Sequence, residues 1–141
     1  MRVEVRRIRH GFRVTVDGER ARTSRRSTCR LIYLTRAVVV KVGSECQNRK
    51  EAAALRDAEV QETAAREGVV LPRLLAVSGD HGWIAVERLP LRRPAISPVA
   101  REAFYSRVER VMSVAGCADH DPGYWNWAMV GGRPAIYDLG V

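Results

Sequence analysis

The sequence predicts an α+β fold, because helical and strand-like segments are grouped along the chain rather than alternating. Strands come first, a long helix follows, and two more strands, a proline-punctuated connector, a second helix and a final hairpin complete the order. Such grouping is typical of α+β domains, whereas regular alternation is typical of parallel α/β sheets. With 141 residues, the chain has the size of one domain, which can consist of two small lobes.

Alternation of apolar and polar residues with period two predicts the strands. Residues 2–9 and 12–17 alternate on either side of a His-Gly turn and are expected to pair. Residues 19–28 are polar, rich in arginine and without periodicity, which favours a loop. The expected strands are residues 2–9, 12–17, 29–34, 37–42, 74–78, 83–86, 127–130 and 135–137.

Two helices are expected. Residues 45–67 are rich in Ala, Glu and Arg and contain neither Pro nor Gly, with Ser44 as a candidate N-cap and Gly68 as a stop signal. Ser97-Pro98 has the pattern of a second helix start, and that helix is expected to end near residue 115.

Composition limits the classes of partner and compartment. The net charge is +8, and nearly all basic residues are arginines. A nucleic acid is one partner for such a charge, and it would bind the arginine-rich N-terminal strands and the loop from Arg20 to Arg30. The charge is scattered, however, and no recognition helix or stacking platform is evident, so nucleic-acid binding is ranked third and not expected. Three widely spaced cysteines favour a reducing, cytoplasmic location. No apolar run is long enough for a membrane span or signal peptide.

Lys41 is unusual because it follows three valines in a strand-like run and is one of only two lysines. Burying an ammonium group without a partner is costly. Lys41 therefore either lies on the exposed face of an edge strand or is buried against a carboxylate. Glu59, in the middle of the expected long helix, is the preferred partner, with Glu51 and Glu62 as alternatives.

The C-terminal segment contains side chains with oxygen atoms that suit a hard metal ion, at spacings that would bring them together. Asp121 and Asn126 are separated by five positions with a Pro-Gly turn between them, and Asp138 follows across an expected hairpin. Carboxylate and amide oxygens suit Mg²⁺, and phosphoryl transfer needs metal ligands together with a carboxylate that orients or deprotonates the acceptor hydroxyl. Asp121-Pro122-Gly123 alone, or Asp138-Leu139-Gly140 alone, would be an ordinary turn. The two together, downstream of Lys41 and a helical glutamate, indicate a nucleotide site.

In this order the motifs resemble the protein-kinase-like fold, including its aminoglycoside and choline phosphotransferase branch. Lys41 looks like the third-strand lysine that grips the phosphates, and Glu59 looks like its partner on the C-helix. Residues 83–90 are similar to the fifth strand and the adenine-binding hinge, which implies that Glu87 and Leu89 contact the cofactor. The resemblance spans roughly residue 12 to the C-terminus.

The resemblance extends to the catalytic loop and the metal ligands. It implies that Asp121 is the catalytic base and that Asn126 and Asp138 bind metal, the last within a segment similar to the Asp-Phe-Gly element. The histidine of the loop is displaced by one position, so Asp119 is an alternative to Asp121. The phosphate-covering loop contains no glycine, and Ser27 and Thr28 are its candidate phosphate contacts.

These expectations define two lobes. Residues 1–89 are expected to form a kinase-like N-terminal lobe, an antiparallel five-stranded sheet plus the C-helix, and residues 90–141 a minimal C-terminal lobe without an activation segment. The expected function is binding of ATP and Mg²⁺, with possible transfer of the γ-phosphate to a protein or small-molecule hydroxyl. The alternative is a catalytically inactive binding module. A homodimer is a possible assembly, because a minimal lobe would leave apolar surface exposed.

Overall fold

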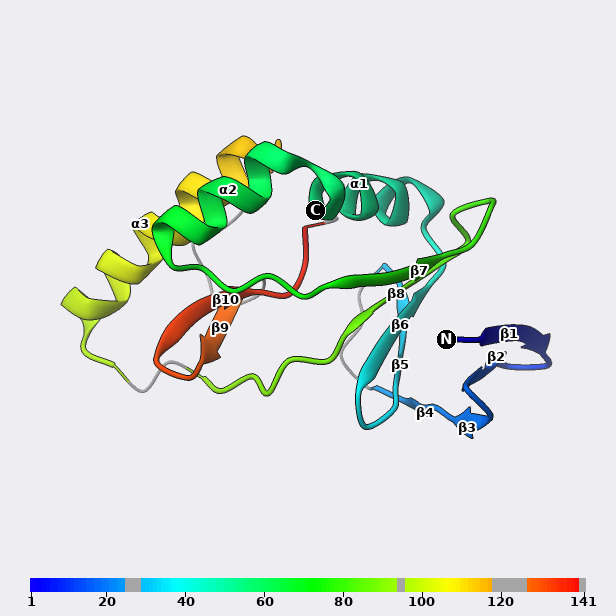
Figure 1. The fold of residues 1–141 in the computed structure, drawn as a ribbon. Helices are drawn as coiled ribbons and strands as arrows, with labels where there is room; N and C mark the ends of the chain where they lie inside the picture. The colour runs from blue at the N-terminus through cyan, green and yellow to red at the C-terminus, as the bar shows by residue number, and fades with distance from the viewer. Residues whose placement is uncertain (25–28, 94–95, 118–126, 140–141) are drawn as a thin grey trace. The chain divides into compact units, whose positions relative to one another are not determined.

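The computed structural model describes residues 1–24, 29–93, 96–117 and 127–139 (Figure 1). These residues form three helices and several antiparallel sheets, which confirms the predicted α+β class. The chain divides into two units. Unit 1 comprises Met1–Ala52 and Arg73–Arg88, and unit 2 comprises Ala53–Pro72 and Leu89–Val141. Residues 53–72, which were expected in the first lobe, thus group with the C-terminal residues.

The larger sheet of unit 1 has five antiparallel strands. Strand β6 (Val38–Val42) lies between β5 (Leu31–Leu34) and β8 (Trp83–Glu87), whereas β4 (Arg22–Thr23) and β7 (Leu74–Val77) form the edges. The β-branched run of β6 suits this central position, because four of its five residues are buried.

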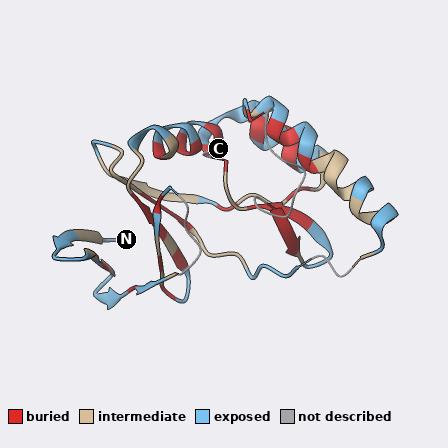
Figure 2. Cartoon of the chain, turned by 180° about the vertical axis from the view of Figure 1, so that it is seen from behind, coloured by how far each residue is buried: buried red, intermediate tan, exposed pale blue. Residues whose placement is uncertain are grey.

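A smaller antiparallel sheet covers one face of the larger one. It consists of β1 (Val3–Ile8), β2 (Gly11–Val16) and β3 (Glu19–Arg20). Val14 and Val16 of β2 belong to a common buried cluster with Tyr33 and with the alternate valines of β6. The main chain of Phe12 also donates a hydrogen bond to the Tyr33 hydroxyl at 3.0 Å. Figure 2 shows buried residues on the strands of the larger sheet and on α1.

The segment expected to be a loop, residues 19–28, contains the short strands β3 and β4. Each has only two residues, so neither is long enough to show a period-two pattern. Both exist because a longer strand offers them a free edge: Arg20 pairs with Thr15, and Arg22 pairs with Leu34. Together they lead the chain from the small sheet to the large one.

The expected long helix is two helices. Helix α1 (Glu45–Arg56) ends before Asp57, and α2 (Ala58–Glu67) begins after it. Asp57 has an extended backbone (φ −73°, ψ 124°), and its carboxylate accepts a hydrogen bond from the N–H of Val60 at 3.1 Å. Asp57 is therefore the N-cap of α2. Gly68 ends α2 in the left-handed conformation (φ 64°), as its position predicted.

Replacing Asp57 by alanine is expected to destabilise unit 2 by about 0.5–2 kcal/mol, because the N–H of Val60 loses its acceptor. Asparagine is an equally good N-cap, so Asp57→Asn is expected to retain most of the stability. Urea denaturation of both variants measures the difference. An Asp57→Ala protein as stable as the wild type would show that the cap contributes nothing.

Unit 2 consists of α2, α3 (Pro98–Val114) and a hairpin of β9 (Trp127–Val130) and β10 (Arg133–Ile136). Helix α3 begins at the predicted Ser97-Pro98 start, with Ser97 as its N-cap, and buries Val108, Val111 and Met112. Helices α2 and α3 lie side by side (Figure 1), where the Arg107 guanidinium donates to the carbonyls of Glu67 and Gly68. Within the described ranges, no helix has both the length and the apolar character needed to cross a membrane.

Candidate functional site

Lys41 lies on the central strand of the larger sheet, where its register partners are Ile32 on β5 and Ile84 on β8. The valines before and after it point into the cluster beneath the small sheet, so period two places Lys41 on the opposite face. Its exposed fraction is 5%. The alternative of an exposed edge position is therefore wrong, and a buried lysine requires partners.

The carboxylate partner is Glu51 of α1. The Lys41 ammonium donates a hydrogen bond to Glu51 Oε1 at 2.5 Å, and Glu51 is only 1% exposed. The expected pairing with Glu59 is wrong, because α1 ends at Arg56 and Glu59 lies exposed in the first turn of α2. Glu51, one of the two alternatives considered, is the pairing residue, while Glu62 is exposed.

The helical period explains why Glu51 is the one chosen. Residues Asn48, Glu51, Ala52 and Leu55 are all buried, and their spacings of three, one and three positions define a single face of a helix. Helix α1 begins three residues after β6 ends, so its first turns are the ones that pass close to Lys41.

Two residues that sequence reasoning missed complete the cluster. Arg30 Nη1 lies 2.7 Å from Glu51 Oε2, an ion pair without hydrogen-bond alignment, and donates a hydrogen bond to Asn48 Oδ1 at 3.0 Å. The Asn48 amide donates to the carbonyls of Gly43 and His81, each at 2.8 Å. Asn48 thereby fixes α1 to the end of β6 and to the turn between β7 and β8.

We refer to Arg30, Lys41, Asn48 and Glu51 as the buried cluster. Each of its four side chains belongs to a residue no more than 5% exposed. Burying ions costs several kcal/mol apiece unless their partners are well placed. The cluster therefore fixes the position of the Lys41 ammonium group. A fixed ammonium group in a low-dielectric site can hold an anion such as a phosphate.

The turn that receives the Asn48 hydrogen bond is itself ordered by Asp80. The carboxylate of Asp80 accepts hydrogen bonds from the Gly82 N–H at 2.8 Å and from the Ser78 hydroxyl at 2.9 Å. These bonds, chiefly the one from Gly82, hold the pKa of the Asp80 carboxyl below its usual value. His81 lies between Ser78 and Gly82 in the chain, so these hydrogen bonds hold its carbonyl where it accepts from the Asn48 amide.

The predicted adenine-binding residues lie at the end of β8 and just beyond it. The Glu87 carboxylate accepts a hydrogen bond from the Arg73 N–H at 3.2 Å, and the Glu87 N–H donates to the Arg73 carbonyl at 2.9 Å. The Arg88 N–H donates to the Ala37 carbonyl, and the Leu89 carbonyl accepts from the Leu91 N–H. Both main-chain N–H groups at positions 87 and 88 are thus used within unit 1.

Of the predicted metal ligands and the predicted catalytic base, the structure describes only Asp138. It follows β10 in unit 2 and is half-buried, next to Leu139, whose carbonyl accepts a hydrogen bond from the Cys117 thiol at 3.4 Å. Several predicted site residues lie outside the described residues, namely Ser27, Thr28, Asp121 with its alternative Asp119, and Asn126.

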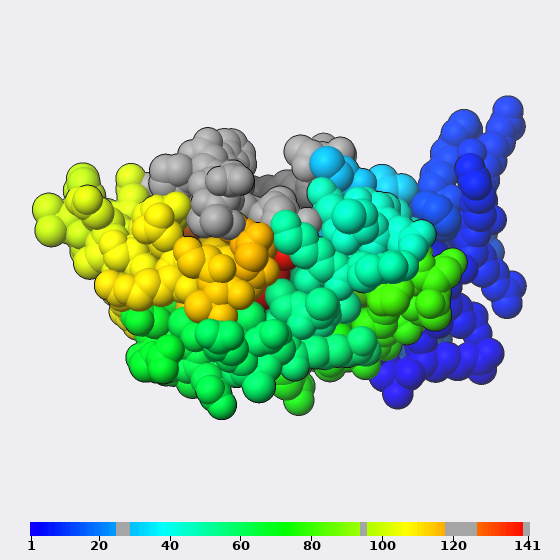
Figure 3. Space-filling view, turned by 90° about the horizontal axis from the view of Figure 1, so that it is seen from above, coloured from blue at the N-terminus to red at the C-terminus, as the bar shows by residue number. Residues whose placement is uncertain are grey.

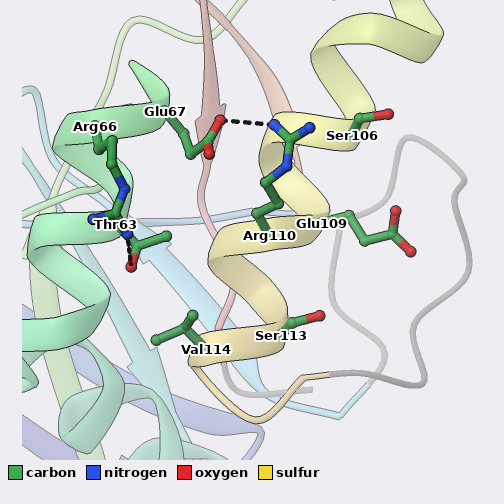
Figure 4. A pocket seen from close by; sticks show the side chains of 8 residues that line it. All are labelled: Thr63, Arg66, Glu67, Ser106, Glu109, Arg110, Ser113 and Val114. Carbon is green, nitrogen blue, oxygen red and sulfur yellow. Dashed lines mark hydrogen bonds and ion pairs between the residues drawn. The ribbon is translucent and has the colours of Figure 1, made fainter.

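Unit 2 has a surface hollow between α2 and α3, with a volume of about 560 Å³ (Figure 4). Three of its four charged side chains bond with their neighbours: Arg110 contacts the Glu67 carboxylate at 2.8 Å, and Arg66 donates to the Thr63 hydroxyl at 3.4 Å. The close-up shows Ser106 and Glu109 pointing away from α2. The hollow lacks converging polar groups, so the buried cluster is the stronger candidate for a functional site.

Comparison with known proteins does not add a family. No protein-family model matches the chain, and no curated protein matches its sequence.

Proposed function

We propose that this chain is a kinase-like protein that binds ATP and Mg²⁺ in a site built around Lys41 and Glu51. The buried Lys41–Glu51 pair is the observation that carries the proposal. Lys41 is on the third strand, in chain order, of the five-stranded antiparallel sheet, and Glu51 is on the helix that follows that strand. Protein kinases place their phosphate-gripping lysine on the third strand and its glutamate partner on the next helix.

The proposal gives each residue a role. Lys41 would bind the α- and β-phosphates, held in position by Glu51, which takes the role first assigned to Glu59. The connection between β4 and β5, including Ser27 and Thr28, would cover the phosphates. In addition, Glu87 and Leu89 would contact the adenine, and Asn126 and Asp138 would hold the Mg²⁺, which neutralises charge on the phosphates.

Transfer of the γ-phosphate is the further step of the same proposal. An acceptor hydroxyl on a protein or small molecule would attack the γ-phosphorus as the bond to ADP breaks, and Asp121 would take the hydroxyl proton. The competing function is a kinase-fold module that binds nucleotide without transfer. Incubation with γ-labelled ATP and candidate acceptors separates the two: label transfer that Asp121→Asn abolishes supports an enzyme, and absence of transfer with intact binding supports the module.

Mg²⁺-ATP is expected to stabilise the protein against heat, because a ligand that binds only the folded state adds about 2.7 kcal/mol at a hundredfold excess over its dissociation constant. Thermal unfolding with Mg²⁺-ATP, with ATP plus a chelator and with Mg²⁺ alone measures this effect. Only the combination is expected to give the full shift. No shift at millimolar Mg²⁺-ATP would overturn the proposal.

A further inference from the structure

The N-terminal strands carry a concentration of positive charge that the proposed nucleotide site does not use. Residues 1–23 contain seven arginines and three carboxylates, which accounts for half of the chain's net charge of +8. In sequence these arginines are scattered among valines and threonines. The question is therefore how the fold of the small sheet arranges them in space.

Strand pairing gathers three of them on one face. Arg6 on β1 lies directly opposite Arg13 on β2, and Thr15, two residues along β2, lies opposite Arg20 on β3. Residues paired across strands share a face, as do residues two apart. Arg6, Arg13 and Arg20 therefore share one face, with one arginine from each strand, and we refer to them as the arginine face.

The other face of the same sheet is the one buried against the larger sheet through Val14 and Val16. The arginine face consequently points away from the core, and all three of its arginines are exposed. The second half of β1 and both residues of β3 are exposed (Figure 2), and Figure 3 shows the atoms of the N-terminal strands, in blue, at the molecular surface.

The arrangement is unfavourable for the isolated protein. Like charges directly opposite each other on antiparallel strands destabilise the pair, and Arg6 faces Arg13 in this way. Within the described part of the chain, none of the three arginines is ion-paired. The nearby carboxylate on the same face, Glu4, instead contacts Arg2 at 2.6 Å. The face thus lacks internal compensation and is complementary to an external polyanion.

We propose that the arginine face binds the phosphate backbone of a nucleic acid without sequence preference. Guanidinium groups bind phosphate oxygens through paired, charge-assisted hydrogen bonds, which suits arginine better than lysine. Neighbouring strands are about 4.8 Å apart, so a row with one arginine per strand can contact several phosphates along one backbone. Thr15 shares this face, and its hydroxyl can also donate to a phosphate oxygen, whereas the charge of Glu4, opposite Thr15, is paired with Arg2.

The experiment measures binding of the full chain to a fluorescently labelled random 20-nucleotide DNA, single-stranded and duplex, across a range of salt concentrations. The test variant carries Arg6→Gln, Arg13→Gln and Arg20→Gln. The control variant carries Arg56→Gln, Arg93→Gln and Arg133→Gln, which are also exposed and remove the same net charge. The logarithm of the binding constant falls as the logarithm of the salt concentration rises. The test variant is expected to make this negative slope shallower by about one per arginine, and the control variant is expected to leave it nearly unchanged.

Several outcomes would overturn the proposal. Equal losses of DNA affinity in the test and control variants would show that only the overall charge matters. Binding to phosphatidylserine vesicles without binding to DNA would assign the arginine face to a lipid surface. The test variant is also expected to unfold at the same or a higher temperature than the wild type, since it relieves the Arg6–Arg13 repulsion. A clear loss of thermal stability in both this variant and Arg13→Thr alone would show that the arginines are structural.

Discussion

Replacing Glu51 by glutamine is expected to destabilise the protein by about 3–5 kcal/mol, the cost of removing one partner from a buried ion pair. Glutamine has nearly the same size and can still accept a hydrogen bond from Lys41. It lacks the negative charge, so Lys41 and Arg30, which lie 2.5 Å and 2.7 Å from the carboxylate oxygens, would lose the attraction of this carboxylate while remaining buried. Urea denaturation followed by circular dichroism measures the change.

The matched control is Glu59→Gln on α2. Glu59 is exposed, and substitutions at exposed positions usually change stability by less than about 0.5 kcal/mol. The pair of variants therefore distinguishes the carboxylate that the structure places against Lys41 from the one that the sequence favoured. Equal effects of the two substitutions would contradict the buried cluster as described.

The sequence was sufficient to predict the strand that holds Lys41, because a β-branched run around one lysine indicates a buried strand and leaves few alternatives. It was not sufficient to identify the partner. The prediction relied on one continuous helix, and Asp57 breaks it. Aspartate is one of the residue types that favour an N-cap, but the surrounding Ala, Glu and Arg residues favour helix on both sides of Asp57.

Arg30 and Asn48 could not have been selected from the sequence. The chain contains 22 arginines, and which of them becomes buried depends on where the connection between β4 and β5 returns to the sheet. Asn48 had one local signal, its position three residues before Glu51 on the same helical face. Its acceptors, however, include the carbonyl of His81, which is 33 residues away and comes close only through the β7–β8 hairpin.

The arginine face likewise could not be predicted in full from the sequence. The expected hairpin, turning at His10-Gly11, would place Arg6 opposite Thr15, whereas the observed turn at residues 9–10 places it opposite Arg13. Arg20 joins them only through β3, a two-residue strand with no recognisable pattern. The strand register, rather than the composition, brings these arginines, scattered in the sequence, onto one face of the small sheet. Nucleic-acid binding was therefore ranked low from the sequence and becomes a specific proposal once the strands are paired.

Replacing Lys41 by methionine is expected to abolish the stabilisation by Mg²⁺-ATP while leaving the protein folded. The two effects separate because Glu51 retains Arg30, 2.7 Å away, as its counter-ion when Lys41 is removed. Methionine fills a similar volume in the buried strand. Removing one partner of a buried ion pair is destabilising because it leaves a buried charge uncompensated, and Arg30 limits this cost by keeping the Glu51 carboxylate paired. Loss of the ligand effect can then be attributed to the missing ammonium group rather than to unfolding.

Lys50→Met is the matched control, because Lys50 is the chain's other lysine and lies exposed on α1. It is expected to retain the full stabilisation, about 2.7 kcal/mol at a hundredfold ligand excess. Thermal unfolding of both variants with and without Mg²⁺-ATP provides the measurement. If Lys41→Met responds to Mg²⁺-ATP as the wild type does, the buried cluster only stabilises the fold, and nucleotide binding must be assigned to other residues.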